Sequence, residues 1–347
     1  MYNKLEIEHF RGIKKASIDG FKQVNLFFGR NNCGKSSLLD AIFLISGPSN
    51  TFIPVQINTM RGYSKIAKDD LKIDFYDMDT DVPIRIKIAN DHTRELFVSL
   101  IQETNNEIVP DSQNNSFLSS IEDKKFGLKL AFSTDGTPYQ SQFIINSISE
   151  DNKVNATISP SDFKESLRCI YLGPKYDFHA SIQGLQNILK NKDEHFIIEG
   201  LQIIEPKVKD FIFTGEEMFV DTGLSRRIPI NVMGDGARKI VSLLTAIYDS
   251  KDGILLIDEL SNGFHHSVMT DLWKVLINAA GRNNTQMFVT THDLDSIKGL
   301  RTASKDMSVE ELVSAYKLQR MADGTLKSYL YTIDSIDYSL NQEIEIR

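Results

Sequence analysis

The chain has 347 residues, of which 41% are hydrophobic and 25% are charged, a composition typical of a globular protein with one domain or two lobes. It carries 39 Lys and Arg against 47 Asp and Glu, and a net charge of −8 excludes an overall basic field for nucleic acid or anionic lipid. Cys33 and Cys169 are too few for a disulfide framework, and no stretch is long and apolar enough to span a membrane. We therefore expect a cytoplasmic protein with no membrane contact of its own.

The N-terminal part predicts a strand, a turn and a helix, followed by an inserted sheet. "NKLEIEHF" alternates like a strand, "KQVNLFF" is a compact apolar run, and "SSLLDAIFLIS" has the spacing of a helix, so "GRNNCGK" is the turn between the last two. Five short runs between Leu71 and Ile148 predict antiparallel strands. These runs are "LKIDFYD", "VPIRIKIAN", "ELFVSLIQ", "FGLKLAFS" and "QSQFIINSI".

The rest of the chain predicts loops, a mainly helical segment and a return to α/β structure. "ETNNEIVPDSQNNS" and "SEDNKVNATISPSD" are polar enough to be exposed loops, and residues 161–210 have helical apolar spacing. After Ile228 the pattern predicts a helix, a strand, a helix, a strand and a hairpin. These elements are "GARKIVSLLTAIYD", "GILLIDE", "SVMTDLWKVLINAA", "TQMFVTTH" and "SAYKLQRMADGTLKSYLYTI". We expect one α/β unit over residues 1–347, with lobes at 1–155, 156–228 and 229–347.

A phosphate-binding loop is the strongest motif. "GRNNCGKSS" fits the pattern G-x-x-x-x-G-K-[ST], in which backbone amides hold phosphates, Lys35 reaches the β and γ groups, and Ser36 ligates Mg²⁺. The alternative is a glycine turn with an exposed lysine. The expected nucleotide-binding residues of this loop are Gly29, Arg30, Asn31, Asn32, Cys33, Gly34, Lys35, Ser36 and Ser37.

Two further buried strands end in polar residues at the same expected edge of the sheet. "ILLIDE" ends in Asp258, a candidate for the Mg²⁺ shell, and Glu259, a candidate to polarise the attacking water. "MFVTTHD" brings His292 to that edge, where an imidazole can hydrogen-bond the γ-phosphate. The alternatives are a buried strand that enters an acidic turn, and a loop histidine without a catalytic role. Glu259, His292 and Lys35 are the expected catalytic residues.

In this order, the segments "FRG", "GRNNCGKSS", "MGDGARK", "ILLIDE", "NGFHH" and "TTHD" resemble the ABC-type ATPase heads of the SMC and RecF group. They resemble most closely the ATPase domain of the OLD (overcoming lysogenization defect) family. The resemblance implies an ABC-type P-loop head with an inserted antiparallel β segment and a mainly helical lobe. It also implies that Met233 to Ala237 form the signature loop and that Arg11 lies near the bound nucleotide.

The sequence departs from the pattern of these families at several positions. Gly234 stands where serine is frequent, Asp235 where glycine is frequent, and Leu260 where proline is frequent. Gln56 is only a weak candidate for the Q-loop glutamine of these families. One position near the γ-phosphate and Mg²⁺ is therefore left unassigned.

The resemblance implies that two heads pair face to face around two ATP molecules. Each nucleotide would lie between the phosphate loop of one head and the signature loop of the other. Amides around Gly234 and Gly236, with the N-terminus of the following helix, can form an anion site that has no phosphate in its own subunit. In such a site the side chain of Asp235 must point away or accept local N–H groups.

OLD-family nucleases continue into a Toprim domain with clustered metal-binding carboxylates, and the residues after His292 contain no such cluster. We therefore expect an ATPase that acts as a homodimer, or a higher homo-oligomer, and as a sensor or regulator of a separate effector in anti-phage defence or abortive infection. A RecF-like DNA-maintenance ATPase is the first alternative, and the ATPase subunit of a transporter is the second. A local basic patch could contact DNA or RNA, although a solvated basic face is the favoured explanation; its residues are Arg226, Arg227, Arg238 and Lys239.

Overall fold

The computed structural model describes residues 1–63, 68–89, 92–103, 125–148, 154–174, 178–215 and 217–341. In these ranges one sheet has thirteen strands in the order β8-β7-β6-β5-β4-β1-β2-β16-β15-β3-β14-β13-β9, and a second sheet has the order β10-β11-β12. The strands are β1 (Lys4–Phe10), β2 (Ile13–Asp19), β3 (Val24–Phe28), β4 (Ile84–Ala89), β5 (Thr93–Glu103), β6 (Lys125–Thr134), β7 (Thr137–Ile148), β8 (Val154–Ser159), β9 (Cys169–Leu172), β10 (Asp210–Thr214), β11 (Glu217–Asp221), β12 (Ile228–Pro229), β13 (Ile254–Ile257), β14 (Gln286–Thr291), β15 (Val313–Arg320) and β16 (Thr325–Tyr331).

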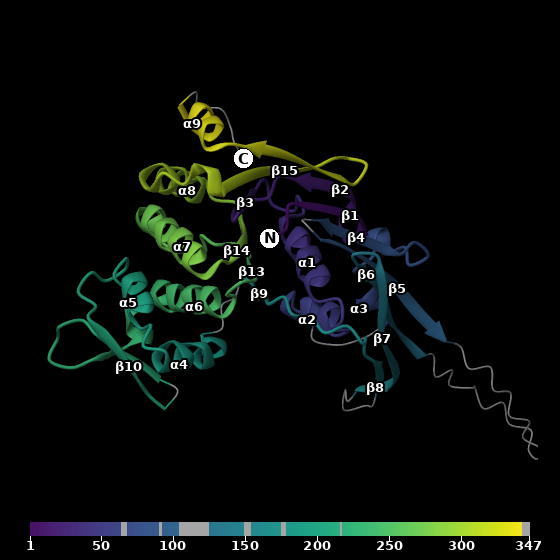
Figure 1. Ribbon diagram of the computed structural model, residues 1–347, viewed down its shortest axis with the longest axis horizontal. Helices are drawn as coiled ribbons and strands as arrows, with labels where there is room; N and C mark the ends of the chain where they lie inside the picture. Colours follow the sequence, from purple (N-terminus) through teal and green to yellow (C-terminus); the bar gives the residue numbers. More distant parts are fainter. Residues whose placement is uncertain are drawn as a thin grey trace, which may run out of the picture.

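Helices cover both faces of the larger sheet (Figure 1). They are α1 (Lys35–Ser46), α2 (Ile53–Met60), α3 (Lys68–Lys72), α4 (Ile182–Lys190), α5 (His195–Leu201), α6 (Asp235–Asp249), α7 (Met269–Asn283), α8 (Leu294–Met307) and α9 (Ile333–Asn341), with the 3₁₀ helices η1 (Tyr76–Met78), η2 (His179–Ser181), η3 (Ile230–Met233), η4 (His266–Val268) and η5 (Glu310–Leu312). In the described part of the chain, no helix is both long enough and apolar enough to cross a membrane.

The central parallel strands are buried on both faces, which explains their uninterrupted apolar sequences. In β3, Val24, Leu26 and Phe28 point into one hydrophobic core, and Phe27 points into the other. β14 pairs in parallel with β3 on one side and with β13 on the other. Figure 1 shows α1 on one side of these strands and α6, α7 and α8 on the other. The carboxyl ends of β3, β13 and β14 therefore meet at one edge between two helical layers.

The prediction of an inserted antiparallel sheet is confirmed. Strands β4 to β8 pair antiparallel to one another in sequence order. The insertion is not a separate sheet, because β4 also pairs with β1, with Ile86 opposite Ile7. The final hairpin is also confirmed, with Gly324 in the turn between β15 and β16.

Two segments differ from the sequence prediction. Residues 71–77 were expected to form a strand, but the end of α3 and η1 lie there. Leu71 lies in α3, whereas Phe75 has an extended backbone and pairs with Phe10 in an isolated bridge, and both side chains are 1% exposed. The second expected loop contains β8, which pairs with β7. Apart from its first residue, the other expected loop, "ETNNEIVPDSQNNS", lies outside the described residues.

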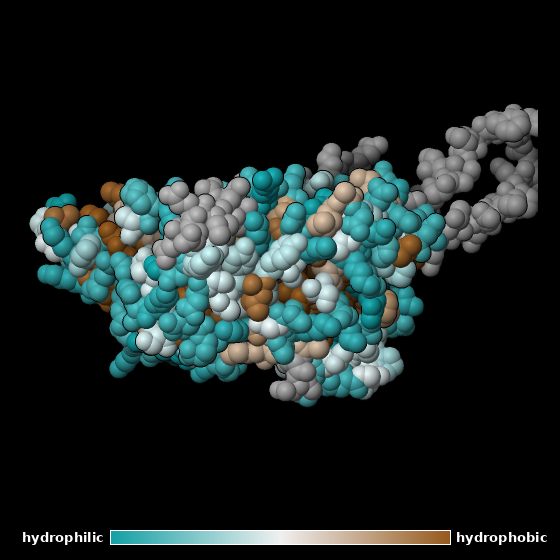
Figure 2. All heavy atoms as spheres, turned by 90° about the horizontal axis from the view of Figure 1, so that it is seen from above, coloured by the Kyte–Doolittle hydropathy of each residue, from teal (hydrophilic) through white to brown (hydrophobic). Residues whose placement is uncertain are grey.

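The segment 156–228 contains α4 and α5, as its apolar spacing predicted, but also β9 and the three-stranded sheet. β9 extends the large sheet by pairing with β13. The face in Figure 2 is mostly hydrophilic, with hydrophobic residues gathered at the end where β10 lies in Figure 1. Ile212 on β10 and Leu224 after β11 are exposed large hydrophobic residues of this part.

α5 packs against α6 so closely that only glycine fits at position 200. A Cβ on Gly200 would lie 2.3 Å from Cδ1 of Leu244 and 2.9 Å from Cγ2 of Ile240. We expect Gly200→Ala to lower the free energy of unfolding by about 1–3 kcal/mol through overpacking. A urea titration measures this value.

Gly281 on α7 is the matched control, because a Cβ there meets nothing within 4 Å. Gly281→Ala should raise the free energy of unfolding by about 0.5–1 kcal/mol through helix propensity. Equal effects of the two substitutions would contradict the proposed packing of α5 on α6.

Candidate active site

The phosphate loop connects β3 to α1, and two of its glycines are required by geometry. Gly29 has φ +148°, and a Cβ there would lie 2.5 Å from the carbonyl oxygen of Leu318 on β15. Gly34 has φ +107° at the N-terminus of α1, which favours glycine. The loop therefore lies close to β15 while its amides, with the start of α1, remain arranged for an anion.

Within the loop, Lys35 and Ser36 point in different directions. Lys35 is 5% exposed, and its Nζ donates to the carbonyl oxygens of Gly29 at 2.9 Å and Arg30 at 3.1 Å. Ser36 Oγ donates to Oδ1 of Asp258 at 3.0 Å. A cavity of about 450 Å³ lies against residues 30–33 and 317–320. Arg30, Asn31 and Asn32 are exposed, whereas Cys33 is buried, and burial raises the pKa of its thiol.

Asp258 follows β13 and is 1% exposed, yet both of its carboxylate oxygens are hydrogen-bonded. Oδ1 accepts from Ser36 Oγ and, at 2.6 Å, from Oγ1 of Thr290 on β14. Oδ2 accepts from Nη1 of Arg61 at 2.8 Å. The hydroxyl and carboxylate oxygens of Ser36 and Asp258 are hard donors of the type that Mg²⁺ prefers, so this pair fits the expected metal site.

Glu259 and His292 form a direct pair at the rim of the same edge. Glu259 Oε2 lies 2.5 Å from Nδ1 of His292, which is half-exposed. Glu259 has φ +58°, an unfavourable value for a residue with a side chain, and its N–H donates to Oγ1 of Thr290 at 2.9 Å. The structure thus brings together the residues that the sequence predicted at the ends of β13 and β14.

Arg11 is held by buried acidic residues beneath the loop. Its Nε and Nη2 donate to Oδ1 of Asp74 at 3.1 and 3.0 Å, and Nη1 donates to Asp40 on α1. Nη2 also donates to Oδ1 of Asn58 at 2.5 Å. Burial raises the pKa of Asp74 to about 6, against the opposing attraction of Arg11. We expected Arg11 near the nucleotide. In the structure its guanidinium connects Asp40 on α1 with Asn58 on α2 and with Asp74.

Sequence reasoning missed Arg61, Asp40 and Thr290. Gln56, the candidate for the Q-loop position, lies exposed on α2. Arg61, which follows the last residue of α2, reaches the site instead. Asp40 carried a usable signal, because it is an acidic residue inside the apolar helix sequence "SSLLDAIFLIS" and is fully buried.

The second glycine loop lies at the start of α6. Gly234 has φ +89°, and a Cβ there would meet nothing within 4 Å in this chain. A Cβ on Gly236 would lie 3.2 Å from Cδ1 of Ile204, a tight contact that Ile204 would have to relieve by a small shift. Asp235 is the first residue of α6 and pairs with Arg238 one turn later, which balances the charge of its carboxylate.

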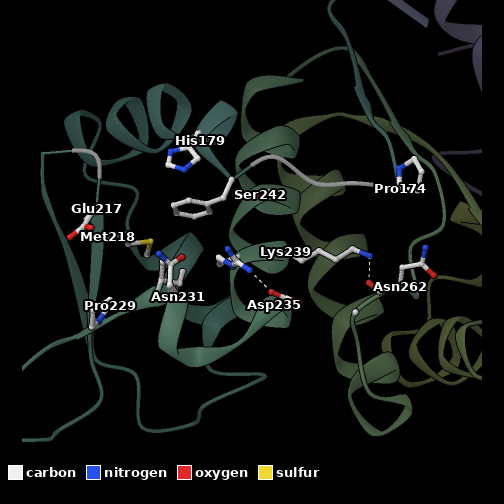
Figure 3. A pocket seen from close by; sticks show the side chains of 14 residues that line it. Pro174, His179, Glu217, Met218, Pro229, Asn231, Asp235, Lys239, Ser242 and Asn262 are labelled. Carbon is white, nitrogen blue, oxygen red and sulfur yellow. Dashed lines mark hydrogen bonds and ion pairs between the residues drawn. The ribbon is translucent and has the colours of Figure 1, made fainter. Parts of the chain in front are cut away.

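Lys239 connects α6 to the loop that follows Asp258. Its Nζ donates to the carbonyl oxygens of Glu259 at 3.4 Å and Leu260 at 2.8 Å, and also to that of Asn262. Figure 3 shows Lys239 extended toward Asn262 and Asp235 turned toward an arginine at the same cavity, which measures about 650 Å³. Burial lowers the pKa of Lys239 to about 7, with Glu259 acting in the opposite direction.

The two glycine loops line different cavities. Among the residues that the structure describes, the cavity at Asp235 and the cavity at residues 30–33 share no lining residue. The expected basic patch is not formed as an open surface, because Lys239 is buried and Arg238 pairs with Asp235. Arg227 pairs with Asp210 at 2.9 Å.

The fold and this arrangement define a P-loop ATPase of the ABC type, which confirms the fold class expected from the sequence. A family model described as "AAA domain, putative AbiEii toxin, Type IV TA system" matches residues 24–297, and the chain belongs to this family. An ATP/GTP phosphatase of Helicobacter pylori is 26% identical over 325 residues, covering 86% of this chain and 87% of the relative. The crystal structure of an Smc head bound to the C-winged helix domain of ScpA aligns with a TM-score of 0.52 at 14% identity, covering 97% of this chain and 99% of that one.

The lowered pKa of Lys239 predicts a pH-dependent contribution to stability. Its folded pKa of about 7 lies below the ordinary value of 10.5, so between these pH values the folded state binds fewer protons than the unfolded state. The difference in unfolding free energy between wild type and Lys239→Met should therefore rise in favour of wild type from pH 7 to pH 10. Urea titrations at several pH values measure it.

Arg238→Met is the control, because Arg238 is the exposed neighbour of Lys239 on the same helix. Its difference from wild type should change little over this pH range. A pH-independent difference for Lys239→Met would show that Lys239 keeps an ordinary pKa in the folded protein.

Proposed function

We propose that this chain binds ATP with Mg²⁺ and hydrolyses it at the edge formed by β3, β13 and β14. One observation carries the proposal. Beside the phosphate loop, Ser36 is hydrogen-bonded to Asp258, and the next residue, Glu259, is hydrogen-bonded to His292. The printed name of the Helicobacter pylori relative, an ATP/GTP phosphatase, supports nucleotide hydrolysis.

The residues take separate roles in this reaction. Lys35 exchanges its bonds to two loop carbonyls for phosphate oxygens, which its flexible side chain permits. Glu259 accepts a proton from the attacking water, and His292 orients that carboxylate from the rim. Ser36 and Asp258 hold the metal site, where Mg²⁺, when bound, neutralises charge on the β and γ phosphates.

We also propose that two copies pair around nucleotide, each completing the site of the other through its signature loop. Gly234 supports this arrangement, since its left-handed backbone has open space where a Cβ would point. At the start of α6, Arg238 balances the charge of Asp235, which would otherwise oppose an anion at this helix N-terminus. Binding of ATP would favour the paired state, and hydrolysis would release it.

The biological role we propose is that of a cytoplasmic, OLD-like sensor or regulator acting on a separate effector, such as a nuclease, in anti-phage defence. The description of its family, which names a type IV toxin–antitoxin system, supports this class of role. The likeness of fold to an Smc head favours a DNA-maintenance ATPase as the second candidate. Stimulation of hydrolysis by duplex DNA would favour the second candidate over the first.

Glu259→Gln removes the proposed proton acceptor but keeps the size of the side chain. Turnover should fall by roughly 100-fold or more, while ATP still binds and holds the paired state. Malachite-green phosphate release and light scattering at saturating ATP measure the two effects. Asp295→Asn, an exposed change at the start of α8, is the control. A Glu259→Gln protein that stays monomeric with ATP would contradict pairing around nucleotide.

Gly234→Val tests the second loop. A side chain there should block approach of another copy, so turnover should fall by at least about 100-fold while the isolated chain still binds ATP. A fluorescent ATP analogue measures binding, and phosphate release measures turnover.

Gly136→Val is the matched control, since Gly136 has φ +81° and equally open space, but lies in the turn between β6 and β7. It should carry a similar backbone strain without loss of turnover. If Gly234→Val hydrolyses ATP at the wild-type rate, the signature loop has no role in the reaction.

A further inference from the structure

Arg61 is one of the side chains at the site that no sequence motif assigned. It follows α2, and its guanidinium bridges two buried carboxylates that lie far apart in sequence. Nη1 donates to Oδ2 of Asp258 at 2.8 Å, and Nη2 donates to Oδ1 of Asp40 at 2.7 Å. Nη2 also donates to the hydroxyl of Tyr171 at 2.6 Å. Arg61 is therefore bound to residues of α1, β9 and the end of β13 at once.

The charges around Arg61 form a continuous chain. Asp74 pairs with Arg11, Arg11 pairs with Asp40, Asp40 pairs with Arg61, and Arg61 pairs with Asp258. Three carboxylates and two guanidinium groups leave one negative charge. Asp258 accepts from the Ser36 hydroxyl, and Nη2 of Arg61 donates to the Ser36 carbonyl oxygen at 3.4 Å. Without Arg61, Asp40 and Asp258 would be two buried carboxylates with one cation fewer, which is strongly unfavourable.

The two carboxylate oxygens of Asp258 have different hydrogen-bond partners, and this difference indicates the role of Arg61. Oδ1 faces the hydroxyls of Ser36 and Thr290, and Oδ2 faces Arg61. Ser36 and Oδ1 of Asp258 would hold a metal ion bound here, and Arg61 contacts the other oxygen. Arg61 thus restrains rotation of the carboxylate without covering the oxygen beside Ser36. Groups that hold a metal ligand in this way typically contribute about 10–100-fold to metal affinity.

We propose that Arg61 is the positioning residue for Asp258, fixing the carboxylate from the end of α2 so that Oδ1 faces the metal position beside Ser36. This inference rests on the proposed ATPase function and deepens it by assigning the residue that prepares the metal site. It also gives α2 a role in the site, although α2 contributes no residue to the phosphate loop.

The test is the Mg²⁺ dependence of nucleotide binding, measured with a fluorescent ATP analogue. Arg61→Gln should raise the Mg²⁺ concentration needed for half-maximal tight binding by about 10–100-fold. Binding in EDTA, which depends on the phosphate loop alone, should stay within about twofold of wild type. Arg61→Lys keeps the charge but cannot bridge two carboxylates bidentately, so its value should fall between those of wild type and Arg61→Gln.

Arg94→Gln is the matched control for loss of a buried arginine. Arg94 pairs with Glu165 at 2.8 Å and donates to two backbone carbonyls at the end of α1, and none of its contacts is with Ser36 or Asp258. Its removal should lower thermal stability and leave the Mg²⁺ requirement unchanged. If Arg61→Gln does not fold, Arg61→Lys carries the test, with an expected increase of at least about threefold.

Three results would overturn the proposal, and each would have a different meaning for Arg61. An unchanged Mg²⁺ requirement in the Arg61 variants would mean that Arg61 only stabilises the fold. A lowered requirement would mean that Arg61 competes with the metal for Asp258. Wild-type protein that binds nucleotide equally with and without Mg²⁺ would refute the metal site and this role of Arg61 together, whereas the first two results leave the ATPase function standing.

Discussion

The candidate active site depends on the carboxylate of Asp258, which is buried and charged. A buried carboxylate is tolerated only when its oxygens are hydrogen-bonded and its charge is balanced. Ser36 of α1, Thr290 of β14 and Arg61 after α2 meet this requirement from three separate parts of the chain. These three contacts join the phosphate loop, the central strands and the end of α2 at one carboxylate.

The site is divided into a fixed interior and an accessible rim. Asp258 is fully enclosed, whereas Glu259 is one residue further along and its partner His292 is half-exposed. The left-handed backbone of Glu259 turns successive carboxylates to these two environments. A carboxylate that holds a metal gains from a fixed orientation, and one that accepts a proton from water must be reached by water. The strained backbone of Glu259 allows two adjacent carboxylates, those of Asp258 and Glu259, to meet these two different requirements.

The sequence predicted what depends on local pattern. The β3–loop–α1 unit, the buried strands and the residues at their carboxyl ends follow from apolar periodicity and from the spacing of Gly29, Gly34 and Lys35. Arg61 was not predictable, because its partner Asp258 is 197 residues away and no motif links them. The region of Leu71 was misread because a short run of mixed residues fits both a strand and helical turns, and in the structure Phe75 keeps one strand-like bridge, to Phe10, between α3 and η1.

The second glycine loop is connected to the loop after β13 in the same chain, although the two glycine loops line different cavities. Lys239 lies on α6, five residues after Gly234, and holds the carbonyl groups of Glu259 and Leu260. Lys239 therefore joins α6 to the loop after β13, so that the helix which begins beside Gly234 and the backbone carbonyl of Glu259 are connected by one side chain.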